Sequence, residues 1–316
     1  MAGQHPEYLW WKGEQRRWDD ANVHISELGW STVGAVFEGI RAYWSEADGE
    51  LYVYRLQEHL ERLHRSMRLV RLPIDYSIDE LTDAIVALLR ANETREDTYV
   101  YPLAYTDDSY TSRFDQLGQK TGLVIHTKPF PSHLGSGIKY QARVSSWRRI
   151  SEDVMPPRVK NLSNYRNGQL ARLEALQDGY NTAILLNQQG KVAEAPGACV
   201  MHVRDGKLIT PDLTQSVLES ITRDALLVLA REVLGVEVEE RAVDRTELYM
   251  ADEIFICGTA AEITPIVSVD KYQTGDGKVG PITRQLETAF EDTLRARETR
   301  YAAWRTPVGV AAPVGA

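Results

Sequence analysis

The chain has little of what marks a secreted or membrane-spanning protein. It contains only two cysteines, Cys199 and Cys257, which lie far apart in apolar, strand-like runs. This spacing fits neither a disulfide framework nor a metal site, so we expect two buried free thiols, no metal and a cytoplasmic protein. The N-terminus, MAGQHPEYLWWKGEQ, lacks an apolar core of signal-peptide length. The sequence contains no run of 18 apolar residues, so we expect no membrane-spanning segment.

The chain also lacks the basic excess that nucleic-acid-binding proteins usually carry. Its formal net charge is -9, so we expect no nucleic acid among its partners. Because no apolar span was found, we expect no membrane among them either. Hydrophobic residues make up 43% of the 316 positions and charged residues 26%. These values are ordinary for a globular protein and allow one or two domains, each with its own core.

Strand-like and helix-like patterns alternate along the chain, with no repeat at a fixed period. Helices are expected over residues 57–70, 77–92, 167–180, 219–235 and 280–296. Single strands are expected over residues 97–107, 121–130 and 138–147. Hairpins are expected over 42–56, with Asp48-Gly49 as the turn, and over 200–211, with Asp205-Gly206 as the turn, and a strand, a turn and a second strand over both 181–195 and 252–270. The stretch PFPSHLGSG (129–137) is the best linker candidate. The sequence therefore predicts an α/β (α+β) fold in two parts, residues 1–128 and 138–316.

One polar stretch, PPRVKNLSNYRNGQ (156–169), places a single lysine, Lys160, after two prolines. A solvated loop lysine is the plain interpretation, because lysine side chains are mostly exposed. A lysine that does covalent work instead forms an imine with a carbonyl compound, and pyridoxal phosphate is the commonest carbonyl cofactor. That cofactor needs a cation and N–H groups for its phosphate, a carboxylate for its pyridine nitrogen and a donor for its ring oxygen.

Candidates for each need lie elsewhere in the chain, and each has a plain alternative. For the phosphate, Arg62 in HLERLHRS offers a guanidinium, SITRD (220–224) opens a helix, and GTAAEITP (258–265) contains a turn between strands. The alternatives are an exposed helix arginine, a capped helix and a turn without a ligand. Glu194, before a Pro-Gly turn, is the candidate for the ring nitrogen, against an exposed carboxylate. Tyr165 is the candidate for the ring oxygen.

The order of these candidates along the chain resembles the branched-chain amino acid aminotransferase family, within the fold-type IV, pyridoxal-phosphate-dependent aminotransferases. The resemblance covers roughly residues 8 to 295. The motifs that carry it are VFEGIRAY (36–43), HLERLHRS (59–66), VSSWRR (144–149), KNLSNY (160–165), SITRDA (220–225), LYMADEIF (248–255) and GTAAEITP (258–265). FEGIR and GTAAEITP together form a specific signature.

The resemblance implies a fold and a set of cofactor-binding residues. The fold would be like that of D-amino acid aminotransferase, with a small α/β domain (1–128), an interdomain loop (129–137) and a larger, barrel-like, mixed-sheet domain that binds the cofactor (138–316). The cofactor would be pyridoxal 5'-phosphate. Lys160 would be the catalytic residue, forming the Schiff base and shuttling protons. The other cofactor-binding residues implied are Arg62, Ile221, Thr222 and Thr259 at the phosphate, Glu194 at the pyridine nitrogen, Tyr165 at the ring hydroxyl and Leu218 on the ring face.

The resemblance also implies a substrate pocket and an assembly. The pocket residues implied are Phe37, Gly39, Tyr99, Tyr101, Thr259 and Ala260, the last two through backbone groups that take the substrate α-carboxylate together with Tyr99. The partners would be small amino donors and oxo acids, and the chain would form a homodimer or a higher homo-oligomer.

The chain departs from the family pattern near the pocket. Tyr101, in YVYP, stands where the family has an arginine that seats the distal carboxylate of glutamate or 2-oxoglutarate. A phenol cannot make the charge-assisted, bidentate contact of a guanidinium. In addition, the Tyr-Gly pair usual before FEGIR is absent from STVGAVFEG, Cys199 stands at an asparagine position, and Glu219-Ser220 replaces the usual Pro-Gly.

The function expected from the sequence is transamination with ping-pong kinetics, between branched-chain L-amino acids (Leu, Ile, Val) and an oxo acid such as 2-oxoglutarate. An (R)-selective amine transaminase, or a mixed activity, is the alternative favoured by the departures. An aminodeoxychorismate lyase-like enzyme, a D-amino acid transaminase and a non-catalytic small-molecule binder are further alternatives.

Overall fold

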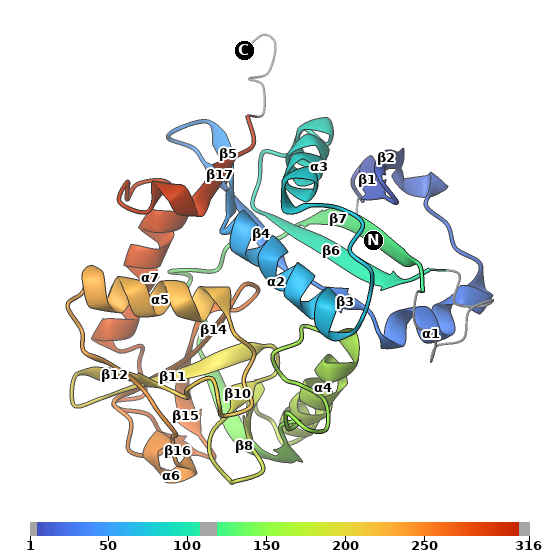
Figure 1. Cartoon of the computed structure of the whole chain (residues 1–316). Coiled ribbons are helices and arrows are strands. Elements are labelled where there is room, and N and C mark those ends of the chain that lie inside the picture. Colours follow the sequence, from blue (N-terminus) through green and yellow to red (C-terminus); the bar gives the residue numbers. More distant parts are fainter. Residues whose placement is uncertain (1–4, 108–118, 310–316) are drawn as a thin grey trace. The chain divides into compact units, whose positions relative to one another are not determined.

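The computed structural model describes residues 5–107 and 119–309 (Figure 1). The chain divides into two compact units, Met1–Ser132 with Val159–Ser163 and Thr293–Ala316, and His133–Arg158 with Asn164–Asp292. The first division falls inside the expected linker. The short segment that carries Lys160 and the C-terminal segment both belong to the first unit. Both segments follow residues of the second unit in the sequence. A division based on sequence order alone therefore could not assign them to the first unit.

The first unit is built on an eight-stranded sheet in the order β17-β5-β4-β6-β7-β1-β2, with β3 beside β6. Every pairing between these strands is antiparallel. The strands are β1 (Tyr8–Trp11), β2 (Glu14–Arg17), β3 (Val36–Phe37), β4 (Ile40–Ser45), β5 (Glu50–Tyr54), β6 (Thr98–Thr106), β7 (Thr121–Pro129) and β17 (Arg305–Pro307).

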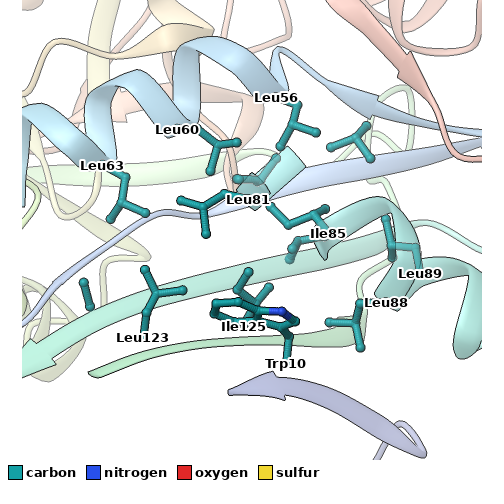
Figure 2. Packing of buried hydrophobic residues seen from close by; sticks show 14 of the residues in the cluster. Trp10, Leu56, Leu60, Leu63, Leu81, Ile85, Leu88, Leu89, Leu123 and Ile125 are labelled. Carbon is teal, nitrogen blue, oxygen red and sulfur yellow. The ribbon is translucent and has the colours of Figure 1, made fainter. Parts of the chain in front are cut away.

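Two helices, α2 (Leu56–Leu69) and α3 (Ile78–Ala91), build the core of this unit. Both were expected from their apolar periodicity, and the capping box of Ser77 with Glu80 at the start of α3 is present. Leucine side chains from the two helices meet residues of β1 and β7 in one apolar layer, as Figure 2 shows. Truncating one such leucine costs about 2 to 5 kcal/mol. The shorter helices of the unit are η1 (Trp18–Asp20), η2 (Ile25–Glu27), α1 (Leu28–Val33) and η3 (Ala302–Trp304).

The second unit is built on a nine-stranded mixed sheet in the order β13-β12-β11-β14-β15-β8-β9, with β10 beside β11 and β16 beside β15. The pairs β12–β13, β15–β8 and β8–β9 are parallel, and the remaining pairs are antiparallel. The strands are β8 (Tyr140–Arg148), β9 (Thr182–Leu186), β10 (Glu194–Ala195), β11 (Ala198–Arg204), β12 (Lys207–Thr210), β13 (Val238–Glu240), β14 (Glu253–Gly258), β15 (Glu262–Val269) and β16 (Tyr272–Gln273).

The longer helices of the second half of the chain are α4 (Leu162–Gln177), α5 (Ile221–Glu232) and α7 (Pro281–Leu294), with the short α6 (Arg245–Leu248) between the last two. Helix α4 begins five residues before the expected start at 167. The cause is local: the Asn161 side-chain oxygen accepts a hydrogen bond from the Ser163 N–H at 2.7 Å and so caps the helix early.

His202 lies on β11 with no exposed surface, and neither ring nitrogen has a hydrogen-bond partner in the described part of the chain. Burial lowers its pKa to about 4, although the charge of nearby Glu247 opposes this change. As the pH falls, His202 therefore becomes protonated near pH 6.5 in the unfolded chain, and only at a lower pH in the folded protein. We expect the free energy of unfolding to fall by about 2 kcal/mol between pH 7 and pH 5 on this account.

Replacing His202 by leucine should remove this part of the pH dependence, because no group is then left to be protonated at that site. The measurement is urea-induced unfolding of both proteins at pH 7 and pH 5. The exposed His5 gives the matched control, and His5→Leu should keep the wild-type difference between the two pH values. A wild-type difference that survives in His202→Leu would contradict the prediction.

Candidate functional site

Lys160 is held in the first unit through its backbone. The Phe37 N–H donates to the Lys160 carbonyl at 3.0 Å, the Leu162 N–H donates to the Ala35 carbonyl at 2.9 Å, and the Lys160 N–H donates to the Ser66 hydroxyl at 3.2 Å. These bonds fasten the lysine to β3, inside the VFEGIRAY motif. Only 9% of the Lys160 residue is exposed. The plain interpretation of a solvated loop lysine is therefore wrong.

The ammonium group of Lys160 lies over the ring of Phe37, with Nζ 4.8 Å from the ring centroid. Phe37 is itself buried. The lysine thus presents its amine to an apolar wall rather than to bulk water, while its main chain is fixed on both sides.

A buried charge cluster lies on α2 and the loop after β3. The Arg62 guanidinium grips Glu38 with both arms of its fork, Nε to Oε1 at 2.7 Å and Nη2 to Oε2 at 2.8 Å. The His59 Nδ1 lies 2.8 Å from Glu38 Oε2. All three residues are less than 5% exposed. Arg62 is therefore not the exposed helix arginine that was its plain alternative.

Charge pairing decides the protonation states in this cluster. Burial alone would raise the pKa of Glu38, but the charge and hydrogen bonds of Arg62, with those of His59, lower it to about 2. Burial lowers the pKa of His59, and the charges of Arg62 and Lys160 act in the same direction, whereas Glu38 opposes them. At neutral pH the cluster is an ion pair braced by a neutral imidazole, and its net charge is close to zero.

The four substrate-pocket residues expected in the first unit lie close together. Phe37 stacks on Tyr101 with ring centroids 5.1 Å apart, and Tyr101 stacks on Tyr99 at 6.4 Å. A side chain at Gly39 would overlap the Tyr99 hydroxyl, so only glycine lets that tyrosine lie where it does. Lys160, Phe37, Gly39, Tyr99 and Tyr101 therefore form one group within this unit.

In the second unit, Glu194 is buried on β10 and both of its carboxylate oxygens are engaged. Oε2 accepts a hydrogen bond from the Leu218 N–H at 2.9 Å, and Oε1 lies 2.8 Å from Arg149 Nε. The Arg149 N–H is not aimed at the oxygen, so this contact is an ion pair rather than a hydrogen bond. Arg149 is 6% exposed. Its motif, VSSWRR, was recognised, but nothing local in the sequence showed that its last arginine meets Glu194.

Other residues expected at the cofactor surround the Pro196–Gly197 turn. A side chain at Gly197 would lie 3.5 Å from the ring of Tyr165, and one at Gly258 would lie 3.3 Å from the Gly197 carbonyl. The turn that contains Thr259 and Ala260 joins β14 to β15, where Gly258 pairs with Glu262. Tyr165, Glu194 and the 259–260 turn are thus gathered in one place in this unit.

Helix α5 begins at Ile221 with its first two residues buried. The Ser220 side chain accepts from the Arg223 N–H at 3.2 Å and caps the helix. The N–H groups of Ile221 and Thr222 have no carbonyl within the helix to bind, so this end of the helix attracts anions.

Cys199 and Cys257 are free and buried, and they face each other on β11 and β14. The Cys199 thiol donates to the Leu218 carbonyl at 3.8 Å. Burial raises the pKa of Cys257, with a further contribution from Cys199. The expectation of two buried free thiols is confirmed.

The expected site residues therefore form two groups, one in each unit. The first unit holds Phe37, Gly39, Arg62, Tyr99, Tyr101 and Lys160, and the second holds Tyr165, Glu194, Leu218, Ile221, Thr222, Thr259 and Ala260. Within residues 5–107 and 119–309, no helix is both long and apolar enough to cross a membrane. In the same part of the chain, no cluster of three or more His, Cys, Asp or Glu residues is arranged to hold a metal ion.

Known proteins match this chain over most of its length. The model of the amino-transferase class IV family matches residues 35–269. A probable branched-chain-amino-acid aminotransferase of Aquifex aeolicus is 41% identical over 291 residues, which cover 92% of this chain and 93% of that protein. The chain belongs to the amino-transferase class IV family. The resemblance and the aminotransferase activity expected from the sequence are confirmed.

Solved structures of other aminotransferases share the fold. The branched-chain amino acid aminotransferase of Thermobaculum terrenum, in its PLP form, superposes with a TM-score of 0.94 at 51% identity, covering 96% of this chain and 99% of that one. The branched-chain aminotransferase of the thermophilic archaeon Thermoproteus uzoniensis, solved with norvaline, gives a TM-score of 0.88 at 38% identity, again over 96% and 99% of the two chains. The expected fold-type IV architecture is therefore confirmed.

Proposed function

We propose that this aminotransferase binds pyridoxal 5'-phosphate and moves amino groups between branched-chain L-amino acids and an oxo acid such as 2-oxoglutarate. The observation that carries the proposal is the buried Lys160, fixed by its backbone to the FEGIR segment. The residues present fit the cofactor, because the chain offers a buried carboxylate at Glu194, a buried guanidinium at Arg62 and the open N–H groups at the start of α5. The names of the relatives support the substrate class.

When bound, the cofactor supplies the carbonyl carbon to which an amine bonds and a ring that accepts electrons. The chain's own part is to bind, orient and move protons. Lys160 Nζ would take the substrate α-proton and return it, acting as general base and then general acid. Glu194 would hold a proton on the ring nitrogen, and its two carboxylate oxygens are held in place by Arg149 and the Leu218 N–H.

The remaining roles are those of anchors. Arg62, the N–H groups of Ile221 and Thr222, and Thr259 would hold the phosphate. Tyr165 would donate to the ring oxygen, and Leu218 would pack on the ring face. Thr259 and Ala260 backbone groups would take the substrate α-carboxylate, as would Tyr99. Phe37, Gly39 and Tyr101 would shape the pocket for an apolar side chain, in which one methylene is worth only about 1 to 3 kcal/mol, so Leu, Ile and Val should all be accepted.

The test is a panel of amino donors in the half-reaction. The reaction is monitored through the loss of the cofactor's visible absorption. L-Leucine, D-alanine and (R)-1-phenylethylamine are mixed separately with the holoenzyme, without an oxo acid. We expect L-leucine to react fastest. Conversion by the (R)-amine but not by L-leucine would instead support an (R)-selective amine transaminase, which the aromatic wall of Phe37 and Tyr101 also suits. Release of pyruvate without any acceptor would favour a lyase.

Location and assembly stay predictions from the sequence. A cytoplasmic location is expected from the two cysteines and the N-terminal sequence, and a homodimer or higher homo-oligomer is expected from the family resemblance. Size-exclusion chromatography with light scattering would determine the oligomer.

Replacing Arg149 by methionine should weaken cofactor binding about tenfold or more. The reason is that Glu194 would lose the buried cation that holds its carboxylate in place, so the carboxylate would be less well positioned to hold the charge of the ring nitrogen. The measurements are the dissociation constant for pyridoxal 5'-phosphate and the pH titration of the bound cofactor's absorption.

Two variants control for a merely structural effect. Arg149→Lys keeps a cation and should recover part of the affinity, whereas Arg148→Met removes the exposed neighbouring charge and should change neither reading. An Arg149→Met protein with wild-type affinity and an unchanged absorption titration would remove Arg149 from the site.

A further inference from the structure

Three neighbouring strands of the first unit place charged and aromatic side chains in one lateral row. On β6, Tyr99 pairs directly with Arg41 of β4 on one side and with Lys128 of β7 on the other. Directly opposed residues of antiparallel strands project from the same face of the sheet. The next pair of β6 and β7 on this face is Tyr101 with His126.

Ring contacts connect this row to Lys160. Nζ of Lys160 lies 4.8 Å from the Phe37 ring, Phe37 stacks on Tyr101 at 5.1 Å, and Tyr101 stacks on Tyr99 at 6.4 Å. Nζ of Lys128 then lies 5.5 Å from the Tyr99 ring. A continuous aromatic strip therefore has the reactive amine at one end and a second ammonium group at the other.

A dicarboxylate substrate needs a cation for its second carboxylate, and β6 does not supply one. Position 101, which in the family pattern carries the arginine, is a tyrosine whose ring stacks on Phe37 and lies tilted against His126, with ring centroids 5.1 Å apart in both pairs. A phenol has no positive charge to offer, so the cation has to come from another residue of this face.

Two of the three basic residues that these pairs place on the face are unsuited to this task. Arg41 is 1% exposed, lies between the rings of Tyr43 and Phe130, and donates from Nη2 to the Phe130 carbonyl at 2.6 Å. It is built into the sheet. Burial, with the charge of Lys128, lowers the pKa of His126, so this imidazole is neutral at pH 7.

Lys128 has the properties that the task requires. Its side chain is exposed, and Nζ lies over Tyr99 and, at 5.7 Å, over Phe130. Within the described part of the chain, no carboxylate lies in ion-pair range of this ammonium group. The rings limit where the flexible side chain goes and leave its three N–H donors for an incoming anion.

We propose that Lys128 binds the distal carboxylate of a dicarboxylate substrate, 2-oxoglutarate or glutamate, and so determines the choice of amino acceptor. The assignment rests on the proposed transaminase function. It moves the distal-carboxylate contact from β6 to the neighbouring strand β7, and it would allow a chain with Tyr101 to use a dicarboxylate.

The test compares two acceptors in the full-length holoenzyme with L-leucine as donor. In Lys128→Met, kcat/KM for 2-oxoglutarate should fall about 10- to 100-fold, because one charge-assisted contact is lost. The value for 3-methyl-2-oxobutanoate, which has no second carboxylate, should stay within about twofold. Lys128→Arg should keep most of the dicarboxylate activity, and Lys139→Met, which removes an exposed lysine elsewhere, should change neither value.

A rescue variant keeps the test independent of general damage to the protein. Adding Tyr101→Arg to Lys128→Met should restore much of the activity with 2-oxoglutarate, because the cation returns at the family position. An equal fall for both acceptors, or no fall for 2-oxoglutarate, overturns the assignment. If the wild-type half-reaction with L-leucine fails, the proposed function fails as well, whereas a normal half-reaction with an unaltered acceptor preference overturns the role of Lys128 alone.

Discussion

Lys160→Ala should lose amino-group transfer by at least about 10⁴-fold in kcat/KM while remaining folded. The amine supplies both the covalent bond to the cofactor and the proton transfer, and positioned proton transfer alone is worth about 10² to 10⁴ in rate. The bonds that hold residue 160 to Phe37 and Ser66 are made by its main chain, so truncation leaves them in place. The measurements are the half-reaction with L-leucine and circular dichroism.

Two comparisons make the Lys160 result specific. Lys160→Arg keeps a cation beside Phe37 but offers no amine of comparable nucleophilicity, so it should be as inactive as the alanine variant. A small primary amine such as methylamine, added to Lys160→Ala, should return part of the proton transfer. Amino-group exchange at the wild-type rate in Lys160→Ala would end the proposed mechanism.

Local patterns in the sequence predicted most of the secondary structure. Helices α2, α3, α5 and α7 have apolar residues at helical spacing, and the capping box of Ser77 marks the start of α3. The hairpin of β4 and β5 was expected from the Asp48-Gly49 turn, and Gly49 has the positive φ of 59° that such a turn requires.

Pairings between distant parts of the chain could not be predicted in this way. The segment that carries Lys160 pairs with β3, where Val36 opposes Asn161, although the two residues are 125 positions apart along the chain. Strand β17 pairs with β5 across a still longer separation. Neither segment is long enough for an alternating apolar pattern, because the first adds one residue and the second adds three to a sheet built by other strands.

The same limit applies to the ion pairs of the candidate site. Motifs picked out Arg62 and Glu194, because arginine suits a phosphate and a carboxylate suits a ring nitrogen. No local pattern indicated that Glu38 grips Arg62 or that Arg149 faces Glu194. Each partner is charged, and a charged residue predicts exposure unless its counter-ion is known. Only the folded chain supplies that counter-ion.

Replacing Glu38 by alanine should lower the free energy of unfolding by about 3 to 5 kcal/mol. The change leaves the Arg62 guanidinium buried without its carboxylate partner, and an uncompensated buried charge is costly. Glu38→Gln keeps the shape and an acceptor oxygen but removes the charge, so its loss should be smaller. Glu61→Gln, at a less buried position on the same helix, should cost under about 1 kcal/mol and serves as the control. Urea-induced unfolding at pH 7 measures all three.

The pH dependence distinguishes the ion pair from a packing effect. The pKa of Glu38 is about 2 when folded and about 4.5 when unfolded, so its contribution is present above pH 4.5 and is lost as the pH falls towards 2. Glu38→Gln should lack this loss. The same variant should also bind pyridoxal 5'-phosphate more weakly. Glu38 orients the guanidinium of Arg62, and that guanidinium would bind the phosphate. If stability and cofactor affinity were both unchanged in Glu38→Gln, the Arg62–Glu38 pair would be neither a structural nor a functional element of the site.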